Sequence, residues 1–307
     1  MNTPNFDFMG KRRIASIGSG ILLLISFTAL AVNGLNMGLD FTGGSLVELS
    51  FTQDVDAQDL RGVLDDNGFA NGTVQYFGSN RDILIRMPPQ LDIDQSTMGD
   101  RIFTTLSGHF EGVELRQSNF IGPAVGEELT EDAGLALLTA LIVVMLYIYF
   151  RFTKQFSIGA VVALVHDVFI VLGFFAIFQW TFDLTVLAAL LAVIGYSLND
   201  TIVVSDRVRE NFRKLRKRTP VQVINESLNQ TLGRTLVTSM TTLFVLLALL
   251  FAGGEVIRGF ALALSIGVVV GTYSSIYVAA SVLLLLKISR EDLLVPEKEE
   301  NTEGSFP

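Results

Sequence analysis

The stretch LTVLAALLAVIGYSLNDTIVV at residues 184–204 is long and apolar, yet it contains one carboxylate, Asp200. A helix needs about 20 apolar residues to cross the hydrocarbon core of a bilayer. Five further stretches along the chain are long enough, or nearly so, and the predicted transmembrane helices occupy residues 14–32, 134–150, 157–178, 184–204, 235–252 and 260–286. The sequence therefore predicts a polytopic α-helical membrane protein with six transmembrane helices.

The composition agrees with this prediction and excludes several classes of protein. Hydrophobic residues make up 50% of the 307 residues and charged residues only 17%, with a net charge of −9. An acidic chain lacks the basic face that nucleic acids require, so no specific nucleic-acid partner is expected. The absence of cysteine excludes disulfides and thiolate chemistry, and His109 and His166 lie too far apart for a His-x-x-x-His zinc motif. No phosphate-binding loop or serine-nucleophile motif occurs either, so we expect neither an enzyme nor a bound metal or cofactor.

The distribution of Lys and Arg predicts the orientation of the chain in the membrane. These residues cluster within residues 1–13, after the second span, within residues 205–234 and after the sixth span. Basic segments stay on the cytoplasmic side, so both termini, the basic loop 205–234 and the acidic tail 287–307 are predicted to be cytoplasmic. Residues 33–133, which carry most of the acidic excess, then lie on the outer face.

The first span has an alternative interpretation as a signal peptide. Residues Ala29-Leu30-Ala31 resemble a cleavage site at its end. The apolar run is longer than the core of a typical signal peptide, which favours an uncleaved helix, and cleavage would leave the rest of the topology unchanged.

The outer segment 33–133 has the pattern of a compact α+β domain. Alternating or apolar strands are predicted at 45–51, 72–77, 82–87 and 113–119, and helices at 55–67 and 95–110, with Asp54 as the N-cap of the first helix. The order strand, helix, strand, strand, helix, strand is that of a ferredoxin-like domain. We therefore expect a ferredoxin-like periplasmic domain between transmembrane helices 1 and 2.

Asp200 and Arg234 are the strongest candidates for a functional pair. A charge inside a membrane costs about 2.5–3.5 kcal/mol on insertion scales, so a retained one is a functional candidate. Tyr196 and Ser197 lie one turn from Asp200, and Arg234 opens the fifth span at a similar depth. Burial disfavours the charged form of a carboxylate and a nearby guanidinium favours it, so relative movement of the two could switch the binding of H⁺ or Na⁺. The alternative is a static ion pair that holds the helices together.

His166 and Asp167 form a second intramembrane group, near the middle of the third span. Either they form a buried hydrogen bond that serves packing, or they act as a secondary proton relay. The sequence does not separate these two interpretations.

Two segments rich in small residues are candidates for close packing and for movement. Gly267, Gly271 and Ser275 recur at four-residue intervals in the sixth span, which lets another helix approach closely, and sliding would use the same smooth face. The segment from Gly38 to Gly44, GLDFTGG, follows the first span, and we interpret it as a structured junction that could serve as a hinge. Its Gly38, Gly43 and Gly44 permit backbone geometry closed to other residues, and Asp40 can cap or hydrogen-bond it.

Several of these segments together resemble a known family. They are the junction Gly38 to Gly44, IGPAVGEEL at residues 121–129, the run Ala192 to Asn211, and TLGRTLVTS at residues 231–239. They resemble the SecF subunits of the bacterial preprotein translocase, within the SecD/SecF family and the resistance-nodulation-division superfamily. The resemblance covers nearly the whole chain, and the single domain of moderate size between the first two spans is also typical of SecF.

The resemblance implies a function, a set of partners and a cellular location. SecF-like chains associate with SecD, and usually YajC, beside the SecYEG channel in the inner membrane, and use the ion gradient to help draw exported preproteins outward. Asp200 matches the family's intramembrane carboxylate and Arg234 its arginine, both implicated in ion coupling. Alternatives are a passive factor that stabilises the translocon, or a half-transporter that exports small molecules or lipids.

Overall fold

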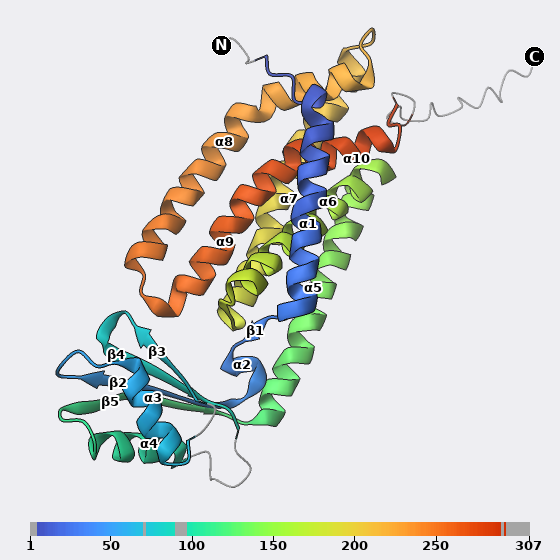
Figure 1. Ribbon diagram of the computed structural model, residues 1–307. Coiled ribbons are helices and arrows are strands. Elements are labelled where there is room, and N and C mark those ends of the chain that lie inside the picture. Colours follow the sequence, from blue (N-terminus) through green and yellow to red (C-terminus); the bar gives the residue numbers. More distant parts are fainter. Residues whose placement is uncertain (1–4, 70–71, 90–96, 290–291, 293–307) are drawn as a thin grey trace, which may run out of the picture.

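The computed structural model describes residues 5–69, 72–89, 97–289 and 292. It consists of a bundle of long helices and a small α/β domain at one end of that bundle (Figure 1). We call this the domain end. The chain begins at the opposite end, where α10 also finishes, and we call that the terminal end. Most of the predicted tail 287–307 lies outside the described residues.

Six segments of the described chain are long and apolar enough to cross a membrane, as predicted. Four are single helices that differ in length, α1 (Arg12–Asn33), α5 (Pro123–Arg151), α6 (Lys154–Phe178) and α7 (Leu184–Lys214). The fifth is α8 (Pro220–Ala252), and the sixth is α9 (Glu255–Ser274) continued by a π-helical turn at Ser275–Ala279 and by α10 (Ala280–Leu285). A short 3₁₀ turn, η1 (Met9–Lys11), precedes α1.

The segment 205–234, predicted as a basic loop, is helical for most of its length. Helix α7 continues to Lys214, because Glu210 pairs with Arg207 and Lys214 along the same helix face. Helix α8 begins at Pro220 with a capping box, in which Thr219 and Gln222 satisfy each other's backbone N–H groups. Only a short turn therefore separates the two helices.

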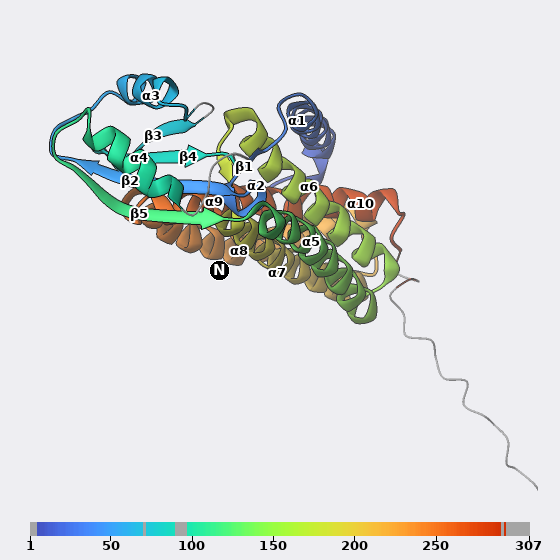
Figure 2. The same cartoon turned by 90° about the horizontal axis from the view of Figure 1, so that it is seen from below.

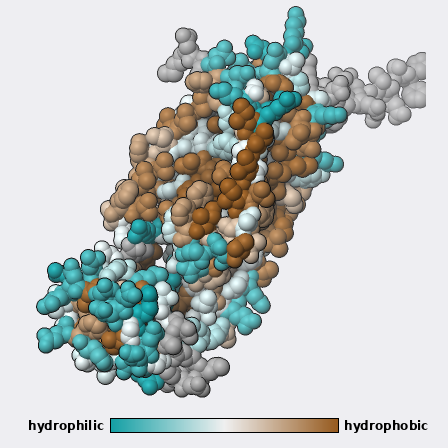
Figure 3. Space-filling view, viewed as in Figure 1, coloured by the Kyte–Doolittle hydropathy of each residue, from teal (hydrophilic) through white to brown (hydrophobic). Residues whose placement is uncertain are grey.

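The helices differ in how much of their surface is covered by the rest of the chain. Helices α6 and α7 lie inside the bundle, whereas α1, α5 and α8 expose large apolar side chains such as Phe150, Phe244 and Val245. Figure 3 shows a broad hydrophobic band over the bundle, with the hydrophilic domain beyond it. An apolar surface of this extent requires lipid or another membrane protein as its surroundings.

The sixth span lies unusually close to α7. A Cβ atom added to Gly267 would lie 2.1 Å from Val193 Cγ2, and one added to Gly271 would lie 3.0 Å from the Cβ of Ser197. The third predicted member of the ladder, Ser275, is buried in the π-helical turn. Turns of this kind are rare within α-helices and occur frequently at functional sites.

The α/β domain has the predicted ferredoxin-like order. Its elements, which follow the predicted segments closely, are β2 (Gly44–Phe51), α3 (Ala57–Asp66), β3 (Thr73–Phe77), β4 (Ser79–Met87), α4 (Met98–Ser107) and β5 (Val113–Ile121). The sheet order is β3-β4-β2-β5 with antiparallel neighbours, and α3 and α4 cover one face (Figure 2). Val47, Ile85 and Leu106 are among the side chains that fill the core between them.

The N-cap of α3 is Asp56 and not Asp54 as predicted. The Asp56 side chain accepts a hydrogen bond of 2.7 Å from the backbone N–H of Gln58. Asp54 lies before the first turn and pairs instead with Arg81 of β4 at 2.9 Å. The prediction placed the start of the helix two residues too early.

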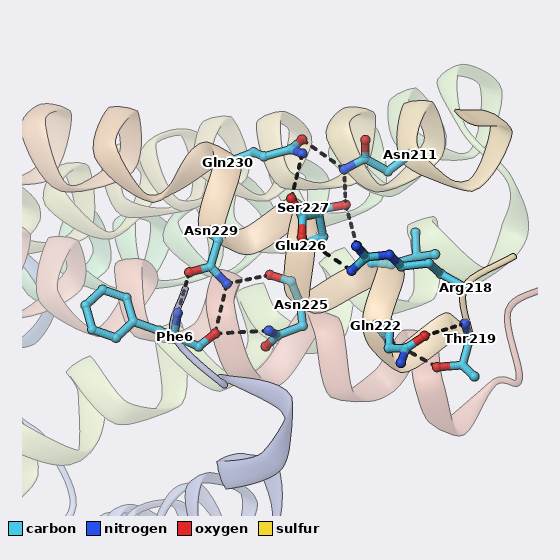
Figure 4. A network of polar contacts seen from close by, with 11 residues as sticks. Phe6, Asn211, Arg218, Thr219, Gln222, Asn225, Glu226, Ser227, Asn229 and Gln230 are labelled. Carbon is cyan, nitrogen blue, oxygen red and sulfur yellow. Dashed lines mark hydrogen bonds and ion pairs between the residues drawn. The ribbon is translucent and has the colours of Figure 1, made fainter. Parts of the chain in front are cut away.

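The N-terminal segment is fastened to the first turns of α8 by two asparagines (Figure 4). The backbone N–H of Phe6 donates to Asn229 Oδ1 at 2.8 Å, and Asn229 Nδ2 donates back to the Phe6 carbonyl at 2.8 Å. Asn225 accepts from the N–H groups of Phe8 and Met9 and donates to the same carbonyl. On the other side of α8, Asn211 of α7 donates to Ser227 and Gln230.

Replacing Asn229 with alanine is expected to release this N-terminal segment. The change removes both hydrogen bonds to the Phe6 backbone, and a lost set of partly buried bonds costs about 1–3 kcal/mol. Limited proteolysis of the detergent-solubilised chain should then cut near Phe6 faster than in the wild type. Asn67→Ala, which removes only a bond within its own helix turn, is the control. Equal cleavage rates in the wild type and Asn229→Ala would contradict this prediction.

Candidate functional site

Asp200 lies in the bundle with one carboxylate oxygen unengaged. Its side chain is 3% exposed, and Oδ2 has no hydrogen-bond partner among the described residues. Arg234 of α8 is exposed, and within the described chain it forms no ion pair with Asp200 at 4.0 Å or less, but it interacts with it electrostatically. Asp200 and Arg234 are therefore close enough to interact electrostatically, but in the described structure they do not form a direct ion pair.

Polar side chains link the three helices around Asp200. Tyr196 of α7 donates to Ser239 of α8 at 3.4 Å, and Ser239 lies 2.6 Å from the hydroxyl of Thr272 in α9. Two hydroxyls next to the charged residues in sequence, those of Thr201 and Thr235, are buried without a partner in the described structure. Buried polar atoms are normally satisfied, so these two hydroxyls leave hydrogen-bonding capacity beside Asp200 and Arg234.

Asp167 contrasts with Asp200, because both of its oxygens are engaged. Its side chain is fully buried, and His166 Nδ1 lies 2.9 Å from Oδ1. Ser197 of α7 and Ser274 of α9 donate to Oδ2 at 2.6 and 2.8 Å. One carboxylate therefore ties α6, α7 and α9 together, and its partner Ser197 lies one helical turn before Asp200 on α7. The relay that the sequence suggested for His166 and Asp167 stays a prediction.

Replacing Asp167 with asparagine is expected to destabilise the bundle. The neutral amide keeps one acceptor, but its NH₂ group replaces an oxygen that accepts charge-assisted bonds, so we expect a loss of about 1–3 kcal/mol. The midpoint of thermal unfolding of the detergent-solubilised chain measures it. Asp206→Asn, an exposed carboxylate on α7, is the matched control. A melting temperature for Asp167→Asn as high as that of this control would show that the network contributes no stability.

The junction that follows α1 is held against the domain end of the bundle. Its β1 (Asn36–Met37) pairs in parallel with β6 (Thr181–Phe182) of the α6–α7 turn, and the short helix α2 (Leu39–Thr42) follows. Asp40 accepts a bond of 2.9 Å from the backbone N–H of Leu184, so it caps another helix and not its own loop. The two glycines after α2 have positive φ, 68° at Gly43 and 119° at Gly44. The role of this segment as a hinge stays a prediction.

Arg86 of β4 connects the domain to the same end of the bundle. Its Nη1 donates to Thr181 Oγ1 at 3.0 Å, whereas its Nε is buried and has no partner among the described residues. Burial lowers the pKa of the Arg86 guanidinium, and the nearby carboxylates of Asp183 and Asp40 act in the opposite direction. Nothing in the sequence had marked Arg86, because it occupies an ordinary strand position.

Comparison with known proteins places these features in a family. The family model described as "Protein export membrane protein SecD/SecF, C-terminal" matches residues 102–289, and the "SecD/SecF GG Motif" matches residues 28–55, which include Gly43 and Gly44. The chain belongs to the SecD/SecF family. Its SecF membership rests on relatives along nearly the whole chain.

The protein translocase subunit SecF of Vibrio alginolyticus is 49% identical, over 95% of this chain and 93% of that protein. SecF of Pseudomonas aeruginosa is 47% identical, over 97% of this chain and 96% of that protein. A crystal structure of SecDF from Thermus thermophilus, titled a translocon-associated membrane protein, matches 92% of this chain with a TM-score of 0.84 and 38% identity. This SecF chain spans 39% of the length of that SecDF chain.

The sequence found the charged site residues but not all of their partners. Asp200, Arg234, His166 and Asp167 stood out as ionisable residues in or beside apolar spans. Ser274 was missed because a single serine in a span carries no signal of its own. Its place directly before Ser275 in the small-residue ladder was the only available indication.

Proposed function

We propose that this SecF chain is an accessory subunit of the Sec translocase that uses the transmembrane ion gradient to promote polypeptide export across the inner membrane. Membership in a family whose relatives are named protein translocase subunits supports the export role. The observation that supports ion coupling is the buried Asp200, with one unengaged oxygen, beside the separated charge of Arg234. Neither an enzymatic step nor a cofactor is needed, since H⁺ or Na⁺ is the coupling ion.

The coupling uses differences in charge between two states of the bundle. When Asp200 binds an ion it loses its net charge, and the attraction of Arg234 for it disappears. Release of the ion restores that attraction, so α7 and α8 have two arrangements of different energy. One charge that crosses 100 mV supplies about 2.3 kcal/mol, which is enough to bias such an equilibrium strongly.

The proposed orientation puts both termini in the cytoplasm and the α/β domain on the periplasmic side. The basic residues of α7 and α8 at the terminal end support this, because basic segments stay inside. In each cycle the bundle would change the position of the domain through the junction 38–44, and the domain would bias the passing preprotein outward.

The proposed partners are SecD, the SecYEG channel, YajC, exported preproteins and the surrounding lipid. The match to 39% of a chain titled SecDF supports SecD, because the remainder of that chain has no counterpart here. The exposed apolar faces of α5 and α8 leave room for another membrane subunit.

Export assayed with and without an ion gradient tests this function. Membrane vesicles that contain the translocase with or without this chain are compared before and after an ionophore collapses the gradient. We expect the chain to increase export only while the gradient exists. An equal increase after collapse would mean a passive assembly factor, and gradient-driven efflux of small molecules without any effect on export would mean a half-transporter.

A further inference from the structure

A cleft of about 730 Å³ separates the α/β domain from the domain end of the bundle. Strands β3 and β4 form one wall, and the α6–α7 turn and the ends of α8 and α9 form the other. Pockets that bind small molecules measure about 300–1,000 Å³, so the cleft is large enough for a ligand. The function proposed above uses no residue of this cleft.

The cleft lies where the membrane-spanning helices end. Helix α6 ends at Phe178 and α8 at Ala252, both at the domain end (Figure 1). Trp180 and Phe251 line the cleft, and Phe251 is 85% exposed. Tryptophan is enriched at the level of lipid headgroups, which suits Trp180 to this position. The wall that holds Phe251 is therefore apolar where α8 ends, and Figure 3 shows that the surface changes from hydrophobic to hydrophilic between the bundle and the domain.

Two guanidinium groups line the cleft. Arg86 from the domain and Arg258 from α9 both line it. Arg86 uses Nη1 on Thr181 and its Nε is buried, so a ligand in the cleft would meet the terminal nitrogens of this guanidinium. Arginine guanidinium groups present planar donors that match phosphate oxygens.

One carboxylate also faces the cleft. Asp183 caps α7 through Oδ1, which accepts bonds from Val186 N–H and the Thr185 hydroxyl. The Asp183 carboxylate places a negative charge on the cleft wall that holds Thr181. Asp40 adds a second negative charge near Arg86. A free inorganic anion is poorly suited to such mixed charge. A zwitterionic headgroup with a phosphate and a primary ammonium group matches it better, because a primary ammonium donates hydrogen bonds to a carboxylate, whereas the quaternary ammonium of phosphatidylcholine has no N–H to donate.

We propose that this cleft binds one glycerophospholipid from the leaflet at the domain end. Its phosphate is held by Arg86 and Arg258, its ammonium group lies near Asp183, and an acyl chain follows Phe251 into the bilayer. A phospholipid such as phosphatidylethanolamine fits both charges. The lipid would fill the space between the domain and the bundle, so it would help to set the position of the domain.

The single tryptophan of the chain offers a direct probe, because Trp180 lines the cleft. The protein is reconstituted in phosphatidylcholine vesicles that contain a low fraction of phosphatidylethanolamine with brominated acyl chains, which quench tryptophan fluorescence on contact. We expect quenching at least threefold above that produced by the same fraction of brominated phosphatidylcholine. In Arg86→Gln/Arg258→Gln this excess should disappear, whereas the control Arg81→Gln/Arg101→Gln should keep it.

Native mass spectrometry of the purified chain distinguishes binding of a phospholipid from binding of free phosphate. We expect one retained phospholipid per chain, at least tenfold less retention in the double arginine variant, and no displacement by inorganic phosphate. Equal retention in both double variants, or displacement by phosphate alone, would overturn the proposal. The melting temperature shows whether Arg86→Gln/Arg258→Gln is folded. If it is not, the comparison of the two brominated lipids in the wild-type protein still tests the proposal. Equal quenching by the two lipids in the wild type would also overturn it.

Discussion

Replacing Asp200 with asparagine abolishes the gradient-dependent part of export while the bundle stays folded, if the proposed coupling is correct. The amide has nearly the same shape, but it can neither bind and release a proton nor balance the charge of a sodium ion. The coupling free energy of about 2.3 kcal/mol per charge per 100 mV is then lost. Because every 1.4 kcal/mol is a factor of ten in an equilibrium constant, this loss corresponds to roughly a 40-fold change in the equilibrium between the two arrangements of α7 and α8. Export by vesicles, with and without the gradient, measures the effect.

Two matched variants separate coupling from folding at Asp200. Asp206→Asn removes a carboxylate from the same helix at an exposed position, and export should remain at the wild-type level. Asp200→Glu keeps the charge and should retain part of the gradient dependence. The coupling proposal fails if Asp200→Asn, assembled with its partners in wild-type amounts, still exports as fast as the wild type in the presence of the gradient.

Gly44→Ala is expected to have the largest effect on stability. Gly44 has φ of 119°, which side-chain-bearing residues rarely adopt, and an added Cβ would lie 2.3 Å from the Met87 carbonyl oxygen. Positive φ costs about 1–2 kcal/mol, and an overpacked contact about 1–3 kcal/mol. Because the clashing atom belongs to the backbone of β4, which pairs with β2, it cannot move aside without disrupting the sheet. Protease resistance and thermal unfolding of the α/β domain within the full chain should both fall.

A nearby glycine provides the control for Gly44. Gly122 has φ of −65°, and a Cβ added there meets no atom within 4 Å. Gly122→Ala should therefore unfold at the wild-type temperature. If Gly44→Ala were as stable as Gly122→Ala, the backbone at Gly44 would not be under the constraint described above.

Hydropathy predicted the number of helices but not their ends. The six spans follow from apolar stretches long enough to cross a bilayer, and the strand order of the domain follows from apolar periods of about 3.6 residues in its helices and 2 in its strands. The extension of α7 to Lys214 is rich in charged side chains and therefore lies outside the hydropathy signal of a span, although Val208 and Phe212 continue an apolar stripe at helical spacing. The start of α8 could have been recognised from Thr219, Pro220 and Gln222, which form a capping box with proline at the first position.

The candidate site could be predicted in its charges but not in its contacts. Asp200 and Asp167 are visible because a carboxylate within an apolar stretch is costly. Their different environments depend on how three helices pack, since the partners of Asp167 come from α7 and α9. The same holds for Arg86, whose position beside Thr181 arises only when the domain meets the bundle.

The parallel pairing of β1 with β6 sets the order in which the protein can be completed during synthesis. Asn36 and Met37 leave the ribosome early, but their partners Thr181 and Phe182 follow only after the α/β domain and two more spans. Domains generally fold as units from the N-terminus onward. The domain therefore folds while β1, which joins it to α1, still lacks its partner strand, and β1 pairs with β6 only after the third span has been inserted.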